Sequence, residues 1–160
     1  MSLHVDDTLA RASRDMLKRL KIRIKPGTMP DTFAAIVAFY GKHGAIAVNN
    51  LWTPDSWMGD LQTAQAFEAW HDYSHITTGG QFTLEGEERV NVLQQAHLMQ
   101  WWADNKDVSP DAIKRASATL DHHNIGRLVH WRQWDGPPEH AKSFAQGYLA
   151  ALGLASKVPL

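Results

Sequence analysis

The sequence predicts an all-α protein, a single bundle of about six helices. Three observations support this fold class. Apolar residues recur at helical spacing, caps and Gly or Pro breaks separate the segments, and no segment alternates convincingly between apolar and polar residues as a half-buried strand does. A chain of 160 residues has the length of one ordinary domain. We therefore expect residues 1–160 to form one helical domain with loose ends at 1–6 and 154–160.

Two helices are expected in the first third of the chain. The first begins at Asp7, repeats apolar residues at helical spacing and ends before a Pro-Gly pair. The second runs through residues 32–40 and closes at Gly41 or Gly44. Because residues 32–40 are apolar on nearly every side, we expect this helix to lie at the centre of the fold. Residues 45–57 contain Asn-Asn and Thr-Pro-Asp, which are typical of a loop.

Four further helices are expected in the rest of the chain. The third spans about residues 60–76 and is stopped by a Thr-Thr-Gly-Gly run, and the fourth spans about 84–105. Ser109, followed by proline, supplies a cap and a first-turn residue for the fifth, which continues toward Trp134. Residues 139–152, after a Gly-Pro-Pro break, make the sixth. Because a short turn joins the third and fourth helices, we expect them to be antiparallel neighbours.

The composition excludes several classes of function. The 16 Lys and Arg residues and 17 Asp and Glu residues give a net charge of -1, which lacks the positive surplus of a nucleic-acid-binding surface. With no cysteine there is no disulfide, thiolate metal ligand or cysteine nucleophile. No apolar run approaches the length of a membrane span, and the N-terminus is acidic, unlike a signal peptide. We expect a cytoplasmic protein with at most peripheral membrane contact.

Nine histidines stand out, because imidazole is the commonest metal-binding side chain. His71 and His75 are four residues apart in the third predicted helix, so both rings project from one face. Asp72 either coordinates a metal or orients a ligand, and Glu87 lies in the first turn of the next helix. Two nitrogens with one or two carboxylate oxygens suit zinc, iron(II), manganese or cobalt. The sequence therefore predicts a metal site between the third and fourth helices.

Further polar side chains are expected to support this site. Glu68 lies one turn before the first histidine and is a candidate acceptor for an imidazole N–H. Asn91 and either Gln94 or Gln95 follow the glutamate at helical spacing, and polar residues on that face need a buried partner or a cavity. Arg127 is a candidate clamp for a substrate carboxylate or phosphate. The other histidines and the tryptophans are expected to be exposed or core-packing residues.

Residues 70–100 resemble a known signature, that of the coenzyme Q (ubiquinone) biosynthesis protein 4 family. The matching positions are His71-Asp72-x-x-His75, Thr78-Gly79 and Gly86-Glu87. Eleven residues separate His75 from Glu87. The resemblance implies an all-helical, lipid-binding protein with a divalent metal, usually zinc, beside a tunnel for a polyprenylated ring. The metal ligands that it implies are His71, Asp72, His75 and Glu87. Family members belong to the ubiquinone-making complex, as an organising component and as the lyase that removes the ring carboxylate.

The residues and the resemblance together predict a metal-dependent decarboxylase for a substituted, prenylated aromatic carboxylate, with coupled hydroxylation if the ion is iron(II). Expected partners are an apolar aromatic or prenylated small molecule, other quinone-biosynthesis proteins and a second copy of the chain. One alternative is a non-catalytic, metal-stabilised lipid-binding or scaffold protein of such a complex. Another is a metal-dependent phosphohydrolase that uses the adjacent His-Asp pair together with His43 and Asp121.

Overall fold

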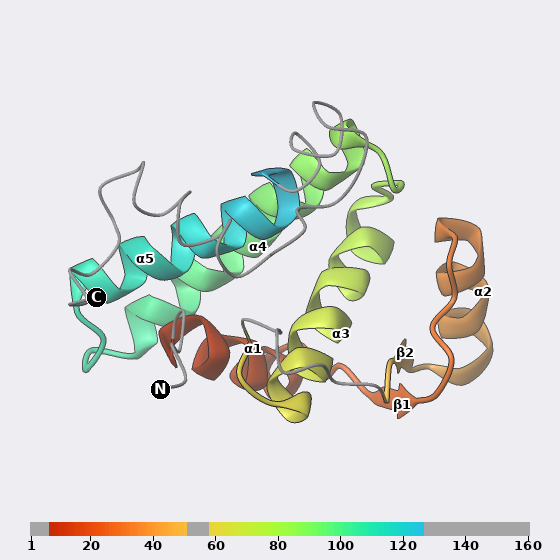
Figure 1. Cartoon of the computed structure of the whole chain (residues 1–160), viewed down its shortest axis with the longest axis horizontal. Coiled ribbons are helices and arrows are strands. Elements are labelled where there is room, and N and C mark those ends of the chain that lie inside the picture. The colour runs from red at the N-terminus through yellow and green to blue at the C-terminus, as the bar shows by residue number, and fades with distance from the viewer. Residues whose placement is uncertain (1–6, 51–57, 127–160) are drawn as a thin grey trace.

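The described part of the chain is mostly helical. The computed structural model describes residues 7–50 and 58–126, and in these ranges it contains five α-helices, a π-helical turn and two short strands (Figure 1). In chain order they are α1 (Asp7–Arg19), β1 (Ile24–Pro26), α2 (Phe33–His43), β2 (Ile46–Val48), α3 (Leu61–Thr78), α4 (Leu84–Asp104), α5 (Pro110–Asp121) and the π turn η1 (His122–Gly126). The all-α prediction is confirmed for these ranges. The predicted loose ends, the fifth helix beyond residue 126 and the sixth helix at 139–152 lie outside the described residues.

Side-chain caps start four of the helices close to the positions that the sequence predicts. In each case a hydroxyl or carboxylate oxygen accepts the backbone N–H three residues on, which satisfies one free donor of the first turn. The caps are Thr32 for α2, Asp60 for α3, Thr83 for α4 and Ser109 for α5. Helices α2 and α3 end on Gly44 and Gly79, whose φ angles of 56° and 68° lie in the left-handed region that glycine adopts without strain.

Two short strands lie in segments where the sequence predicts none. Strands β1 and β2 form a parallel pair in which Ile24 lies opposite Ile46, Lys25 opposite Ala47 and Pro26 opposite Val48. β2 lies within the segment expected to be a loop, and all three of its residues are buried. Three residues are too few to show alternation, and a strand buried on both faces has none. The pattern that identifies a strand from sequence is therefore missing here.

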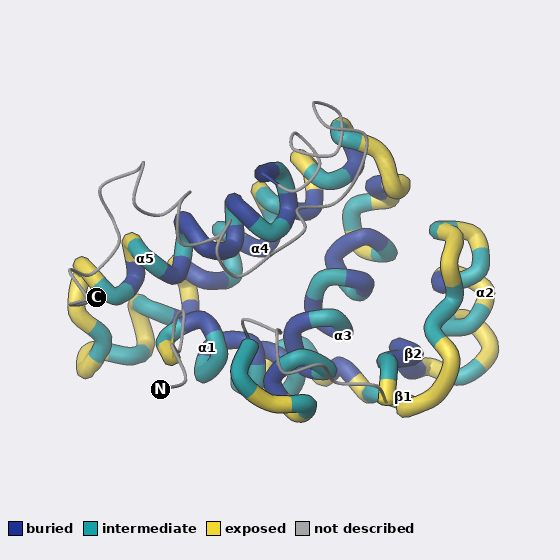
Figure 2. The backbone as a smooth tube through the Cα atoms, viewed as in Figure 1, coloured by how far each residue is buried: buried dark blue, intermediate teal, exposed yellow. Residues whose placement is uncertain are grey.

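Helix α2 lies at the edge of the molecule, and the prediction that it is central is wrong (Figure 1). It packs against β2 and α3, and Ile36 is its one buried residue. Val37 is 40% exposed, and Figure 2 shows much of this helix as exposed. A helix that is apolar on every side gives no indication of which side packs, so its sequence does not reveal its position. None of the described helices is long and apolar enough to cross a bilayer.

The hydrophobic core lies where α1, α3, α4 and α5 meet. Its largest side chains are Leu9, Met16, Phe67, Trp70, Leu98, Trp101 and Leu120. Helices α3 and α4 converge at the turn 79–83 and diverge away from it, with α1 packed across the far end of α3 (Figure 1). The π turn η1 continues α5 alongside α4 and brings His123 against Phe67 of α3. Three segments therefore meet at the convergent ends of α3 and α4.

Candidate metal centre

Three of the predicted ligands meet where α3 and α4 converge. His75 Nε2 is 3.1 Å from His71 Nε2 and 3.2 Å from Glu87 Oε1. His71 Nε2 is 3.4 Å from Glu87 Oε2. Among residues 7–50 and 58–126, these three form the one group of three or more His, Asp or Glu side chains whose donor atoms all lie within 4.8 Å of one another. We call His71, His75 and Glu87 the metal triad.

The spacing of the metal triad fits one divalent ion. With metal–ligand bonds of roughly 2.0–2.2 Å, ligand atoms lie roughly 2.8–3.1 Å apart around an octahedral ion and roughly 3.3–3.6 Å apart around a tetrahedral one. The observed separations run from 3.1 to 3.4 Å and fall across both ranges. Two nitrogens and a carboxylate suit zinc, iron(II), manganese or cobalt. Three protein ligands leave coordination positions for water or substrate.

Hydrogen bonds orient both imidazoles from the side away from the triad. His75 Nδ1 donates to the carbonyl oxygen of Gly80 at 2.6 Å, and His71 Nδ1 donates to Gln94 Oε1 at 3.3 Å. Because an amide oxygen only accepts, each Nδ1 carries a proton and each Nε2 is available as the ligand atom. Metal-binding histidines typically have such an acceptor on their second nitrogen.

Two glycines shape the turn that brings Glu87 to the histidines. A Cβ on Gly86 would lie 1.8 Å from the carbonyl oxygen of Gln81 and 2.7 Å from its backbone nitrogen. A Cβ on Gly80 would lie 2.7 Å from the carbonyl oxygen of Gly86. Only glycine allows backbone segments to approach so closely. This approach places the Gly80 carbonyl at His75 and brings Glu87, the next residue after Gly86, to the triad.

Glu87 is an anion held between two imidazoles. Burial alone would raise the pKa of its carboxyl, but the adjacent His71 and His75 outweigh burial and lower that pKa from 4.5 to about 2. Burial would likewise lower the pKa of His75, but its hydrogen bonds to the Glu87 carboxylate and the Gly80 carbonyl, and the charges of Glu87 and Asp72, raise that pKa. The metal-free triad therefore favours a proton on His75 and a negative charge on Glu87. A bound divalent ion takes the place of that proton.

Acid is expected to release metal from the triad. A bound ion needs a neutral imidazole, and the pKa of His75 lies above its usual 6.5, so protons compete for Nε2 at and above that pH. The apparent affinity for zinc should therefore rise with pH through the pKa of His75 and level off beyond it. Zinc titrations against a competing chelator across the neutral range measure this. Equal affinity on both sides of the His75 pKa would contradict the prediction.

The pH dependence of the stability of the metal-free protein also reports the charges of Glu87 and His75. The lowered pKa of Glu87 contributes stability above pH 4.5 that is lost as the pH falls toward about 2. The raised pKa of His75 contributes stability below pH 6.5 that is lost as the pH rises through the folded-state value. The loss of unfolding free energy in Glu87→Gln should therefore be greatest between pH 4.5 and 6.5. Chemical denaturation gives this difference, and a loss that grows above pH 8 would contradict it.

Asp72 does not join the metal triad, although the resemblance implies that it is a ligand. The donor atoms within 4.8 Å of one another belong to His71, His75 and Glu87 alone among the described residues. Successive residues of an α-helix project about 100° apart, so Asp72 leaves α3 in a different direction from His71. It is buried, and burial is the largest effect that raises the pKa of its carboxyl. The charge of Glu87 also raises this pKa, while the two histidines lower it. Asp72 therefore acts on the triad through its charge.

Glu68 lies near the triad, but the imidazole N–H groups bond to other acceptors. Those acceptors are the Gly80 carbonyl and Gln94. Burial raises the pKa of Glu68, and the charge of Asp72 adds to this effect, while a backbone N–H and His71 oppose it. Its Oε2 atom is buried and has no hydrogen-bond partner within the described ranges. Glu68 and Asp72 thus form a pair of acidic groups one helical turn apart beside His71.

Asn91 is connected to the triad through three successive hydrogen bonds. It donates to Asp121 and accepts from Asn124. Asn124 also donates to Gln94, the acceptor of His71. Gln94 is one of the polar residues predicted to need a buried partner, and it is fully buried. Asn124 was missed by the sequence analysis, because it lies in a π turn that interrupts the predicted fifth helix and leaves no recognisable pattern.

Aromatic rings pack around the histidines of the triad. Phe67 stacks on His71 with ring centres 6.2 Å apart, and His123 of η1 meets both rings edge to face. Phe82, which is 44% exposed, meets the ring of His75 edge to face at 4.9 Å. The His71 side chain is 16% exposed, so the triad can be reached from solvent. These three aromatic neighbours could not be identified from the sequence, because they come from separate segments.

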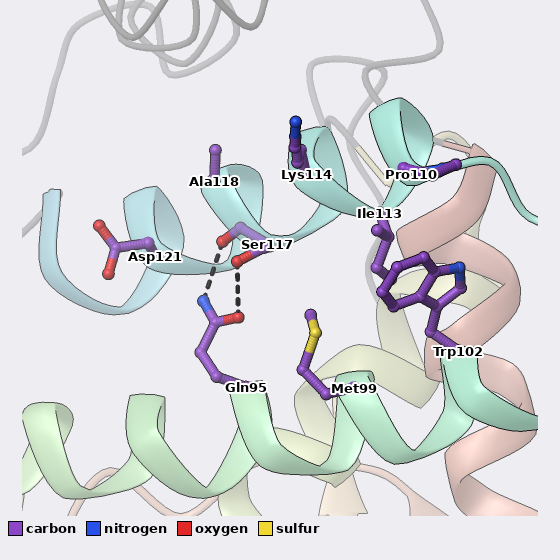
Figure 3. A pocket seen from close by; sticks show the side chains of 9 residues that line it. All are labelled: Gln95, Met99, Trp102, Pro110, Ile113, Lys114, Ser117, Ala118 and Asp121. Atoms are coloured by element: carbon purple, nitrogen blue, oxygen red, sulfur yellow. Dashed lines mark hydrogen bonds between the residues drawn. The ribbon is translucent and has the colours of Figure 1, made fainter.

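The additional ligands of a phosphohydrolase do not join the triad. His43 packs against Phe39 within α2, with ring centres 4.4 Å apart, and Asp121 accepts a hydrogen bond from Asn91. Asp121 lies at one end of a groove of about 510 Å³ between α4 and α5 (Figure 3). Figure 3 also shows Gln95 of α4 hydrogen-bonded to Ser117 across this groove. None of the residues that line the groove belongs to the triad.

Comparisons with known proteins give no relative from which a function can be transferred. No protein-family model, curated protein sequence or solved structure matches the chain. The similarity of residues 70–100 to the coenzyme Q biosynthesis protein 4 signature therefore stays a prediction from the motif. Arg127, the candidate clamp for a substrate carboxylate, lies outside the described residues.

Proposed function

We propose that this chain is a metal-dependent enzyme that binds one divalent ion at the triad and removes the carboxylate of a substituted, prenylated aromatic acid. Zinc is the ion we favour, and iron(II), manganese and cobalt suit the same ligands. The observation that supports the metal centre most strongly is the shared orientation of the imidazoles. Each Nδ1 is bonded to an acceptor while each Nε2 faces Glu87 at the spacing of metal ligands. The motif resemblance suggests the reaction class.

The reaction class suits a centre of this charge and composition. Decarboxylation breaks the bond between the ring and the carboxyl carbon, leaves the electron pair on the ring carbon and requires a proton there as carbon dioxide departs. A divalent ion supplies a Lewis acid for a carboxylate or phenolate oxygen, and iron(II) with two histidines and one carboxylate also supports dioxygen chemistry. His71 and His75 bind through neutral Nε2 atoms, and Glu87 adds a single negative charge. The ion and its three ligands would therefore carry a net positive charge, which attracts an anionic substrate and which the charge of the buried Asp72 would reduce.

The surroundings of the triad suit an aromatic substrate. Phe67 lies against His71, and the partly exposed Phe82 lies against His75. Phe82 offers stacking and edge contacts to a planar ring held beside the metal, while Phe67, which is 1% exposed, forms part of the buried apolar wall beside His71. They also keep water away from part of the site, which strengthens the interaction between the ion and a substrate oxygen.

Turnover of a prenylated hydroxybenzoate tests the proposal. Protein loaded in turn with zinc, manganese, cobalt or iron(II) should yield the decarboxylated ring, detected by mass spectrometry. Metal-free protein and the Glu87→Gln variant should lose at least about 100-fold in rate, because the Lewis acid is absent or weakly held. The matched control is Glu85→Gln, since Glu85 lies in the same turn of α4 but is 76% exposed and pairs with Arg89. It should keep full activity.

Two results would contradict the proposal. Equal turnover in wild-type and Glu87→Gln protein would separate the reaction from the triad. Tight zinc binding without turnover under any of the four metals would favour the non-catalytic lipid-binding or scaffold function instead.

A further inference from the structure

A chain of side-chain hydrogen bonds runs from the end of α5 to the metal triad. Asp121 Oδ1 accepts from Asn91 Nδ2 at 2.8 Å, and Asn91 Oδ1 accepts from Asn124 Nδ2 at 3.1 Å. Asn124 Nδ2 also donates to Gln94 Oε1 at 2.9 Å. The same Gln94 oxygen accepts from His71 Nδ1. We call this series, from Asp121 to His71, the polar chain.

The direction of each bond in the polar chain follows from its carboxylate end. The Asp121 carboxylate only accepts, so Asn91 turns its amide nitrogen toward Asp121. Asn91 then presents its oxygen to Asn124, which must present its own nitrogen in return. That nitrogen has a second hydrogen, and Gln94 meets it with its amide oxygen. The Gln94 oxygen can only accept from His71, so Nδ1 of His71 carries a proton and Nε2 is left for the metal.

Burial enforces this direction. Gln94 and Asn124 are 0% and 1% exposed, so water is not available to replace a lost partner. Gln94 Nε2 and Asn124 Oδ1 have no hydrogen-bond partner in the described part of the chain. Buried polar atoms without partners are rare and costly, and they persist where surrounding bonds determine the arrangement. Here the bonds that are made all orient the ligand His71.

Asn124 reaches the polar chain because α5 changes into a π turn at His122–Gly126. Single π turns of this kind are frequent at functional sites. The π turn packs against α4, which supplies Gln94, and its residue His123 contacts the ring of His71. The π turn therefore contributes to the surroundings of His71 twice, through the ring of His123 and through the amide of Asn124.

We infer that Asn124 is a positioning residue that acts through Gln94 to hold His71 in its metal-binding tautomer, with Asp121 setting the polarity of the chain. This inference rests on the proposed metal centre for its functional meaning. The tautomer itself is a property of the metal-free protein, so it can be measured whether or not metal binds.

Nitrogen NMR of metal-free protein with ¹⁵N-labelled histidine, at alkaline pH, reads the tautomer of His71. The wild-type protein should show His71 protonated on Nδ1 alone. Asn124→Leu removes both donated hydrogen bonds at similar side-chain volume, which allows Gln94 to rotate. We expect a mixture of His71 tautomers in this variant and a zinc affinity lowered roughly 10- to 100-fold.

Asp121→Asn provides a second variant that leaves the core intact, because Asp121 lies at the end of the α4–α5 groove (Figure 3). Asparagine can either donate to Asn91 or accept from it, so the polarity of the chain is lost and the His71 tautomers should again mix. The control is Asp111→Asn, which changes an exposed aspartate in the first turn of α5 and should leave the His71 signals unchanged.

The outcomes separate this inference from the proposed function. Wild-type His71 protonated on Nε2, or an unchanged tautomer in Asn124→Leu, would overturn the positioning role of Asn124. An unchanged tautomer in Asp121→Asn would overturn the role of Asp121 in setting the polarity of the chain. Wild-type protein with His71 protonated on Nδ1, mixing in both variants and no affinity for zinc would support the polar chain and refute the metal centre.

Discussion

Replacing Glu87 with glutamine is expected to lower the affinity for zinc by at least about 100-fold, more than the roughly 10- to 100-fold cost of losing an outer partner of a metal ligand. The change keeps the size of the side chain but removes the negative charge and one of three donors of the triad. The Glu87 carboxyl, with a pKa of about 2, is ionised throughout the neutral range. An amide is a weaker ligand for zinc. Titration against a chromogenic chelator measures the change.

Glu85→Gln controls for the loss of a negative charge from the same helix. Glu85 lies two residues before Glu87, but its side chain is 76% exposed and forms a surface ion pair with Arg89. Such pairs contribute little to stability, and we expect zinc affinity to stay within about twofold of the wild type. If Glu87→Gln bound zinc as tightly as Glu85→Gln does, Glu87 would not be a ligand.

Replacing Gly86 with alanine is expected to lower the free energy of unfolding by about 3 kcal/mol, at the upper end of the usual cost of overpacking, and to weaken zinc binding. The new Cβ would lie 1.8 Å from the backbone oxygen of Gln81, so no change of rotamer relieves the clash. The turn must open, which moves the Gly80 carbonyl away from His75 and displaces Glu87. Chemical denaturation of the metal-free protein and zinc titration give the two effects separately.

Gly41→Ala is the matched control for this substitution. Gly41 lies within α2, and a Cβ there would meet nothing within 4 Å beyond the adjacent backbone of its own helix. Alanine favours a helix over glycine by up to about 1 kcal/mol, so stability should be unchanged or slightly higher, with zinc affinity unaffected. A Gly86→Ala protein as stable as Gly41→Ala would mean that residues 80–86 do not make the close backbone approach described above.

Much of the helical framework could be predicted because helix ends depend on local chemistry. Thr32, Asp60 and Ser109 each accept a backbone N–H from their own first turn, and that signal is readable without knowledge of the fold. The strands and the peripheral place of α2 could not be predicted. Both depend on which surfaces meet, and three buried residues or an evenly apolar helix do not specify a partner.

The metal triad could be predicted because its members are close in sequence. The hydrogen-bond partners that orient its imidazoles could not be predicted. Spacing alone puts His71 and His75 on one face of a helix, and a short turn returns Glu87 to them. The orientation of the rings depends on distant groups instead: Gln94 lies 23 residues after His71, and Asn124 lies 30 residues after Gln94. Contacts at such separations depend on how the helices pack, which no periodic pattern in the sequence specifies.

Anomalous scattering from a crystal grown with zinc, recorded at the zinc absorption edge, tests the metal triad most directly. We expect one anomalous peak per chain, roughly 2.0–2.2 Å from His71 Nε2, His75 Nε2 and a carboxylate oxygen of Glu87. A structure in which zinc lies at other histidines while these three side chains bind none would contradict the assignment of the triad as a metal centre.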